Sequence, residues 1–568
     1  MHNHSPGCSR SKSYKSQCTH PMGSQARVLL SSVFGPYAQD DEYGSRTINP
    51  MELFHNQVTR MQGPFSLRIF NRSWGLMLIQ KNIEVPCTLL DFPTLERFIE
   101  EIRTHQYDIV GISSIMVNVL KVKKMCELVR RYLPHALIVI GGHISNLPNL
   151  ADMIDADHIV KGDGVRWFRH FLGEDVDRSI QHPQVYTNIG TRTMGIRVRL
   201  KPEDDMATLI PSVGCPQGCN FCSTSAMFGG KGKFVNFYET GDELFDIMCQ
   251  LESSMKVRSF FVMDENFLLH RRRALRLLEL MESHDKAWSL HIFSSAEVLS
   301  SYTIEQLVSM GLSLVWMGLE GEGSQYTKLH GVDTFTLVRE LRSHGIRVLG
   351  STIIGLENHT PRNTDQIIEY AVRHNSDFHQ FMLYMPLPGT PLYNEISSKG
   401  LLKHESELSL PDQHGQFKFN YFHPHIKGDL EEALLLRAFD RDYEMNGPSI
   451  VRMIRTGLSG WKRYKNCPDK RIRRRIACES RDLAKRGTAV VAAAKAYCAE
   501  NPILHATISS LLEDLCNEFG SKARRAADLA GPLVLEQIME ETHQLQQGVT
   551  YEPPTFYEKS NTGREIQL

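Results

Sequence analysis

The stretch GCPQGCNFCS, residues 214–223, decides how the rest of this sequence is interpreted. Its three cysteines have the spacing Cys215-x₃-Cys219-x₂-Cys222 and follow an apolar segment at 207–213 that is typical of a buried strand. Three thiolates on one tight loop can hold three irons of a [4Fe–4S] cubane. The fourth iron then has no protein ligand and is open to a cofactor or a substrate.

Other uses of these cysteines fit the spacing less well. A structural zinc site needs four ligands, usually in two pairs, and no second pair lies nearby. A dithiol redox pair needs two cysteines that open a helix, whereas this loop has three. The remaining cysteines of the twelve, such as Cys126, lie among apolar neighbours and are expected to be small buried side chains.

Bulk composition favours an ordinary globular protein in a reducing compartment. The chain has 568 residues, 41% hydrophobic and 23% charged, and a formal net charge of −1, which gives no general attraction to nucleic acid. The polar first 25 residues lack the apolar core of a signal peptide, and no apolar run reaches about 18 residues. We therefore expect a cytoplasmic protein without a transmembrane helix and without disulfides.

Two regions alternate apolar strands with amphipathic helices, which predicts an α/β fold. In the first, strands are expected at 26–34, 85–92, 108–114, 136–143 and 157–164, as in a doubly wound parallel sheet. In the second, strands at 207–213, 257–264, 288–295, 312–320, 347–355 and 378–386 predict a partial or full TIM-type barrel. The predicted organisation is a disordered tail (1–26), a Rossmann-type domain (27–175), a linker (176–205), the barrel (206–395) and a helical region (396–568).

The cysteine loop after the first barrel strand resembles the signature of the radical S-adenosylmethionine (SAM) superfamily, and Phe221 matches the family's aromatic residue before the third cysteine. The resemblance implies that SAM binds the unique iron and is split into methionine and a 5′-deoxyadenosyl radical. It also implies cofactor-binding residues at the carboxyl ends of the strands. After the second strand, MDENF (263–267) departs from the commoner family pattern and offers Asp264, Glu265 or Asn266 for the SAM amino group. The later strands offer Ser294, Ser295 or Glu297, then Glu320, and then Ile353, Gly355 and Glu357.

A doubly wound domain directly before such a barrel resembles the cobalamin-binding class of the same superfamily. The resemblance rests on DIVGISSIMVNVLKVKKMCELVRR, LIVIGGHISNLP and VKGDGVRWFRHF. It implies that the loops after these strands surround the corrin, with Ser113, Ser114, Gly141, Gly142, His143, Gly162 and Gly164 as the candidate residues. The DxHxxG motif that supplies a lower histidine ligand in other cobalamin proteins is absent. The lower face of the cobalt therefore need not meet a histidine.

About thirteen Lys or Arg residues lie between Arg452 and Arg486, with apolar residues interleaved. This pattern indicates either a solvated helix face or an amphipathic patch that contacts an anionic membrane surface. Nucleic-acid binding has no recognition module to support it. The expected partners are a small-molecule or lipid substrate and an external electron donor of the flavodoxin or ferredoxin type.

These resemblances imply a cobalamin-dependent radical SAM enzyme, expected to methylate an unactivated carbon of a hydrophobic or natural-product substrate. Two alternatives stay open. One is a cobalamin radical SAM cyclase or oxidase of the tetrapyrrole type, and the other is a non-catalytic iron–sulfur sensor.

Overall fold

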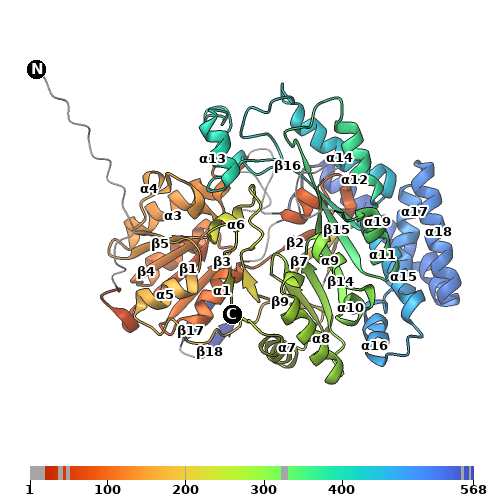
Figure 1. The fold of residues 1–568 in the computed structure, drawn as a ribbon, viewed down its shortest axis with the longest axis horizontal. Helices are drawn as coiled ribbons and strands as arrows, with labels where there is room; N and C mark the ends of the chain where they lie inside the picture. Colours follow the sequence, from red (N-terminus) through yellow and green to blue (C-terminus); the bar gives the residue numbers. More distant parts are fainter. Residues whose placement is uncertain are drawn as a thin grey trace, which may run out of the picture.

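The computed structural model describes residues 19–35, 42–45, 52–198, 200–320, 331–551, 555–561 and 564–567. Two parallel sheets lie side by side, and a helical block borders the second sheet on the side away from the first (Figure 1). Of the tail predicted to be disordered, residues 1–18 lie outside the described part. Residues 19–26 are ordered, because the His20 amide donates to the Phe171 carbonyl at 2.7 Å and Ala26 is fully buried.

The first sheet confirms the predicted doubly wound fold. Its five parallel strands run in the spatial order β3-β1-β4-β5-β6. They are β1 (Val28–Ser32), β3 (Cys87–Asp91), β4 (Ile109–Ser113), β5 (Leu137–Gly141) and β6 (His158–Ile159). Helices cover both faces: α2 (Leu95–Thr104) and α3 (Val119–Tyr132) pack on one, α1 (Trp74–Asn82) and α5 (Gly164–Leu172) on the other, and α4 (Leu150–Met153) follows β5. Because both faces are covered, the strands are mostly apolar, with polar residues such as Ser31, Ser32 and Asp91 towards their carboxyl ends.

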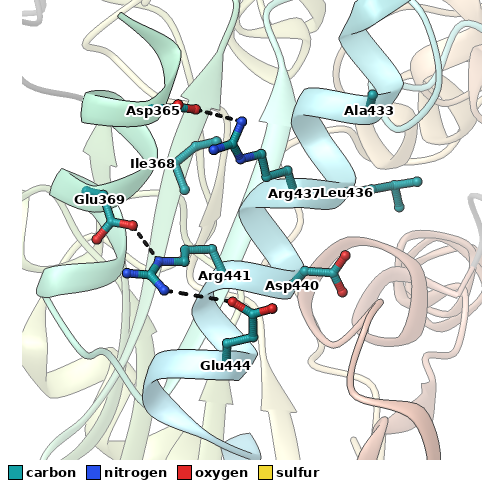
Figure 2. A pocket seen from close by; sticks show the side chains of 9 residues that line it. All are labelled: Asp365, Ile368, Glu369, Ala433, Leu436, Arg437, Asp440, Arg441 and Glu444. Atoms are coloured by element: carbon teal, nitrogen blue, oxygen red, sulfur yellow. Dashed lines mark hydrogen bonds and ion pairs between the residues drawn. The ribbon is translucent and has the colours of Figure 1, made fainter.

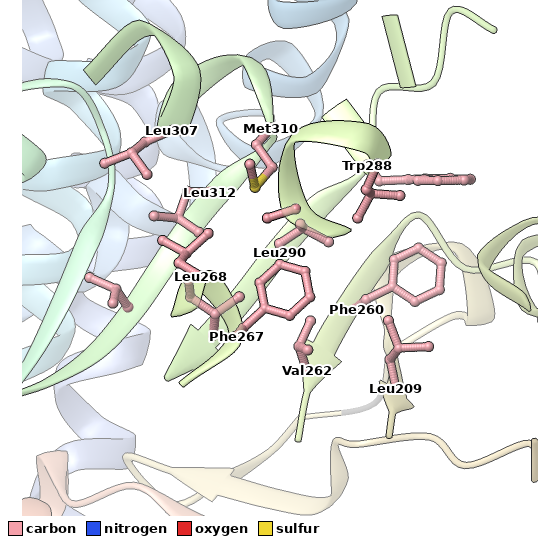
Figure 3. Close-up of a cluster of buried hydrophobic side chains, with 14 of the residues drawn as sticks. Leu209, Phe260, Val262, Phe267, Leu268, Trp288, Leu290, Leu307, Met310 and Leu312 are labelled. Atoms are coloured by element: carbon pink, nitrogen blue, oxygen red, sulfur yellow. The ribbon is translucent and has the colours of Figure 1, made fainter. Parts of the chain in front are cut away.

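The second sheet is an open arc of six parallel strands in chain order, as the barrel prediction allowed. The strands are β9 (Met206–Leu209), β12 (Ser259–Val262), β13 (Ser289–Phe293), β14 (Leu312–Glu320), β15 (Arg347–Ile354) and β16 (Phe378–Leu383). The helices between them are α7 (Gly241–Met255), α8 (Arg271–Ser283), α9 (Ala296–Ser300), α10 (Ile304–Ser309), α11 (Thr334–Ser343) and α12 (Thr364–Arg373). Figure 3 shows the core between strands and helices, where Phe260, Leu290 and Trp288 are buried.

Short elements connect the two sheets. A three-stranded sheet joins β2 (Arg68–Phe70), β7 (Ile189–Thr193) and β8 (Ile196–Arg197), and a two-stranded one joins β10 (Ser212–Val213) and β11 (Val235–Asn236). The turn η2 (Phe54–Val58) packs Phe54 against Trp316 and Phe378, with ring centroids 6.1 and 5.8 Å apart. The N-terminal part of the chain therefore supplies apolar contacts to the inner face of the second sheet.

The C-terminal region is helical up to residue 546, but the chain then returns to the first sheet. The helices are α13 (Pro391–Ser398), α14 (Leu430–Asn446), α15 (Ser449–Tyr464), α16 (Lys470–Glu479), α17 (Thr488–Tyr497), α18 (Pro502–Phe519) and α19 (Ser521–Gln546). After them β17 (Phe556–Asn561) pairs antiparallel with β3, and β18 (Arg564–Gln567) pairs with β17. The predicted helical character of the C-terminal region is confirmed. The strand β17 is an addition to it, a polar edge strand that a distant partner stabilises: Glu558 pairs with Arg72 at 2.6 Å.

Three arginines of the basic stretch 452–486 are engaged in packing within the protein, whereas about half of its basic residues are exposed. Arg471 and Arg475 are buried, and Arg475 donates to the carbonyls of Leu312 and Val308 at 3.2 and 3.1 Å. Arg452 is buried in an ion pair with Asp442 at 2.8 Å. These three arginines therefore attach α15 and α16 to neighbouring elements, and contact of the exposed part of the stretch with a membrane surface stays a prediction. Among the described helices, none is long and apolar enough to cross a membrane.

A polar groove of about 470 Å³ lies between α12 and α14 (Figure 2). Ion pairs cross it from Arg437 to Asp365 at 2.9 Å and from Arg441 to Glu369. Both helices pack through apolar residues on the outer side of the second sheet. This groove is therefore separate from the carboxyl ends of the strands, where the predicted site residues lie.

Candidate functional site

The cysteine loop joins β10 to the short helix α6 (Ser223–Met227). Cys222 caps this helix, with its Sγ 3.5 Å from the Ser225 amide, and its own amide donates to the Cys219 carbonyl at 3.0 Å. The Ser225 hydroxyl donates to the Cys215 carbonyl at 3.1 Å. The helix cap and these hydrogen bonds hold the loop in one conformation, which fixes the three thiols relative to one another.

Two glycines let the loop pack tightly. Gly214 has a φ of +88°, and a Cβ there would lie 2.8 Å from the Cβ of Phe228. Gly218 has a φ of +65°, and a Cβ there would lie 2.5 Å from the Cα of Lys231. A side chain at either position would both strain the backbone and collide with the segment that covers the loop.

The three thiols are a donor set that a [4Fe–4S] cluster can use. Burial, together with a smaller effect of the neighbouring Cys222 and Cys219, raises the pKa of the Cys215 thiol to about 11. Within the described residues, no three His, Cys, Asp or Glu side chains converge on a point that could take one metal ion. Cubane ligands bind three different irons and need not converge. The donor set therefore fits the predicted [4Fe–4S] cluster.

The segment after β12 brings three polar residues beside this loop. Asp264 is buried and accepts from the Ser212 hydroxyl at 2.6 Å and from Arg273 at 2.5 Å. Glu265 differs, because its Oε2 is buried without a hydrogen-bond partner. Burial raises the pKa of Glu265 to about 7, while the Gly214 amide acts in the opposite direction. Of the two carboxylates, Glu265 is thus the one left to meet a ligand.

Asn266 links the ends of β12 and β13. Its Oδ1 accepts from the Ser294 hydroxyl at 3.1 Å and from the Ser295 amide at 3.2 Å. Its Nδ2 lies 3.4 Å from the Ser295 hydroxyl. Asn266, Ser294 and Ser295 are all buried, and they form a polar layer at the carboxyl ends of these strands.

The remaining barrel candidates lie at the ends of β14 and β15. Glu320 is buried, with a φ of +55°, as the last residue of β14. Gly355 has a φ of +86°, and a Cβ there would lie 2.3 Å from the Phe419 ring. Packing against the Phe419 ring is therefore enough to require a glycine at this position. Glu357, two residues later, differs from the buried candidates in being exposed to solvent.

The loops of the first sheet form a second cluster of candidates. Ser113 ends β4, and a Cβ on Gly142 (φ +83°) would lie 2.5 Å from the Ser114 carbonyl oxygen and 2.8 Å from the Ser113 hydroxyl. The Ser114 amide donates to the Gly141 carbonyl at 3.1 Å. These four residues thus pack together where β4 and β5 end.

The loop after β5 contacts the cysteine helix directly. It forms the turn η5 (His143–Asn146), where His143 Nε2 lies 3.2 Å from the Thr224 hydroxyl and Asn146 Nδ2 donates to the Ser223 carbonyl at 3.2 Å. Burial lowers the pKa of His143, so the imidazole is neutral at pH 7. Asn146 is buried and its Oδ1 has no partner. The first sheet therefore meets the cluster loop through α6, which lies between the two sheets in Figure 1.

Two further segments border this contact. Gly162 (φ +94°) follows β6 and faces the Met227 carbonyl at the end of α6, while Gly164 begins α5 against Ile79. After β16, the PLPGTP segment (386–391) places Gly389 against Asn146. The Leu392 amide then donates to the Asn220 carbonyl at 3.0 Å.

Aromatic residues line the inner face of the second sheet just below the polar layer. The ring centroids of Phe261 and Phe293 lie 5.7 Å apart, and Phe293 stacks on Trp316 at 5.1 Å. All three remain partly exposed. Trp316 Nε1 donates to the Ser351 hydroxyl at 2.7 Å, which donates to Gln380 at 2.8 Å. Sequence reasoning missed this wall and Thr224, because β12 (SFFV) and β14 (LSLVWMGLE) show no polar and apolar alternation that would mark an inner face.

Comparison with known proteins assigns each of the two sheets to a known type of domain. A model of the B12 binding domain matches residues 76–172, and a model of the radical SAM superfamily matches residues 209–371. The chain thus pairs a B12-binding domain with a radical SAM domain. This is the domain pair of the cobalamin-dependent radical SAM enzymes, and the cofactors that go with it are cobalamin, a [4Fe–4S] cluster and SAM. The predictions of fold class, family and cofactors are confirmed.

Individual relatives are distant. Bacteriochlorophyllide d C-8(2)-methyltransferase of Chlorobaculum tepidum is 24% identical over 367 residues, 58% of this chain and 75% of that protein. The anaerobic magnesium-protoporphyrin IX monomethyl ester cyclase of Rubrivivax gelatinosus is 23% identical over 347 residues, 53% and 60% of the two chains. The solved radical SAM methyltransferase TsrM of Kitasatospora setae, with cobalamin and a [4Fe–4S] cluster bound, is 16% identical, with a TM-score of 0.49 over 80% of this chain and 99% of that one.

Proposed function

We propose that this enzyme transfers a methyl group to an unactivated carbon of a hydrophobic substrate. The observation that carries the proposal is the contact between η5 and α6, through His143 with Thr224 and Asn146 with Ser223. It joins a loop of the B12-binding domain to the helix that begins at the third cluster cysteine. The two cofactors would therefore meet at one point, with the substrate between them.

The residues at this point have distinct roles in the proposal. Cys215, Cys219 and Cys222 hold the cluster, and Glu265 offers its unpartnered Oε2 to the ammonium group of SAM. The layer of Asn266 with Ser294 and Ser295 presents further polar groups to SAM. When bound, the cofactors supply a hydrogen-abstracting radical and a transferable methyl group.

Corrin binding is assigned to the loops that contain Ser113, Ser114, Gly141, Gly142, His143, Gly162 and Gly164. Because His143 already has Thr224 as a partner, we do not assign it as a cobalt ligand. A His143→Ala variant should keep a corrinoid spectrum after reconstitution. Complete loss of that spectrum would instead show that the imidazole holds the cobalt.

The substrate class follows from the inner face of the second sheet. Phe261, Phe293 and Trp316 offer a continuous aromatic surface that remains partly exposed. Burying flat apolar groups on such rings stabilises a complex through area burial and through ring stacking. We therefore propose a polycyclic or isoprenoid substrate, and a relative that methylates bacteriochlorophyllide d supports this class.

The experiment supplies SAM with a trideuterated methyl group to anaerobically reconstituted enzyme and to extracts of a strain that lacks the gene. Mass spectrometry should find a substrate that accumulates in the deletion strain and gains the labelled methyl group in vitro. A Trp316→Ala variant should bind this substrate more weakly while it still cleaves SAM. If no compound takes up the label although SAM is cleaved, methyl transfer is wrong.

A second candidate is a cyclase or oxidase of the tetrapyrrole type, favoured by the similarity to the magnesium-protoporphyrin cyclase. The same experiment separates the two candidates. A cyclase or oxidase product would show a new ring or added oxygen and no deuterium from SAM.

A further inference from the structure

The cluster loop is covered on one side by an exposed segment that we call the lysine loop, residues 228–234 (FGGKGKF). The Gly232 amide donates to the Pro216 carbonyl at 2.8 Å, and the backbone of Lys231 lies directly against Gly218. Pro216 and Gly218 both lie between cluster cysteines. A single layer of backbone therefore separates the cluster loop from this surface.

The surface is basic and has no acidic residue of its own. Lys231 and Lys233 are exposed, and within the described residues neither makes an ion pair. From Cys215 to Tyr238 the sequence contains no Asp or Glu. The Phe234 ring lies 5.1 Å from the His270 ring, which places the exposed Arg271 and Arg272 at the start of α8 next to this loop.

Other parts of the cluster loop contact the first sheet and the segment after β16. The B12-binding domain contacts α6 through η5, and the Leu392 amide after β16 bonds to Asn220. Phe221 packs against Tyr384 at 6.2 Å. A protein that must reach the cluster without entering the substrate site would therefore approach through the lysine loop.

We infer that the lysine loop is the docking surface for a small acidic one-electron carrier. This inference rests on the proposed function, since SAM cleavage consumes an electron that the chain itself does not supply. In the docked complex the carrier loses one electron and is oxidised, and the cluster gains it, passing from the 2+ to the 1+ state. No proton or group is transferred. Lys231 and Lys233 attract the carrier and orient it, because complementary charge raises the association rate and fixes the approach.

The test compares a Lys231→Glu, Lys233→Glu double variant with a control of equal charge change, Lys470→Glu with Lys522→Glu, on two exposed lysines of the helical region. Binding of an oxidised acidic flavodoxin is measured directly by calorimetry at low and high salt. Wild type and control should bind at low salt and weaken as salt rises, and the loop variant should bind about tenfold more weakly or worse. Equal binding by the loop variant and the control, or no binding by wild type at low salt, would overturn the inference.

A second arm keeps this inference distinguishable from the proposed function. With dithionite as a small reductant, both double variants should form 5′-deoxyadenosine at the wild-type rate. With reduced flavodoxin, only the loop variant should be slow. Failure of all three proteins with dithionite would count against the proposed function, whereas equal rates with flavodoxin would count against the docking surface alone.

Discussion

Replacing Gly218 by alanine tests how strongly the fold depends on packing at the cluster loop. Its φ of +65° costs a residue with a Cβ about 1–2 kcal/mol. The new Cβ would also lie 2.5 Å from the Cα and 2.8 Å from the amide nitrogen of Lys231. Since such atoms prefer separations of about 3.5–4 Å, the backbone at Lys231 must move by roughly 1 Å. Overpacking of this kind adds about 1–3 kcal/mol.

Gly400 provides a matched control, because its φ is +66° and a Cβ there would meet nothing within 4 Å. Gly400→Ala carries the backbone strain alone. After anaerobic reconstitution, we expect Gly218→Ala to hold much less iron and sulfide than the wild type. It should also unfold at a lower urea concentration. Gly400→Ala should retain iron at the wild-type level. If the two variants hold equal iron, contact between the cluster loop and the lysine loop does not shape the site.

Three further predictions concern other parts of the chain. Burial lowers the pKa of His182 to about 4, below its ordinary 6.5, so the unfolded chain binds a proton that the folded one does not. The free energy of unfolding should therefore fall by about 2 kcal/mol between pH 6.5 and pH 5. The thermal midpoint of His182→Gln should fall less over this range than that of the wild type. Equal falls in the two proteins would contradict the burial argument. Arg475→Ser should lower the free energy of unfolding by about 3 kcal/mol, since it leaves two buried carbonyls without a donor. Arg474→Ser, which removes a half-exposed ion pair, should lower it by under about 1 kcal/mol. Urea unfolding measures both values, and similar losses would show that Arg475 is not a packing residue. Deleting residues 556–568 removes one of two carboxylates around Arg72 and should make the first sheet more sensitive to limited proteolysis, while an unchanged cleavage pattern would argue against β17.

The sequence predicted those features that depend on local patterns. Continuous apolar runs marked the parallel strands, and the spacing of Cys215, Cys219 and Cys222 marked the cluster loop without any need for the fold. The resemblance implied Gly142 and Gly162 as candidates, and both lie in loops at the carboxyl ends of the first sheet. In each case, one short segment contains enough residues to define the feature.

Features that depend on distant partners could not be predicted in this way. The arginines of α16 suggested a charged surface, but Arg475 is buried because carbonyls more than 160 residues earlier in the chain accept its hydrogen bonds. Gly355 matched a cofactor position, yet the ring that needs its small size is Phe419. The strand β17 is polar, and it depends on pairing with β3, more than 460 residues earlier in the chain.

The most direct test of the account is the formation of 5′-deoxyadenosine from SAM by anaerobically reconstituted protein reduced with dithionite. Wild type should cleave SAM, and so should Cys126→Ala, whose thiol is buried in the apolar core of the first sheet. Cys215→Ala, Cys219→Ala and Cys222→Ala should each abolish cleavage, since a cubane held at only two irons is lost. Wild-type cleavage by any one of these three variants would contradict the assignment of the cluster.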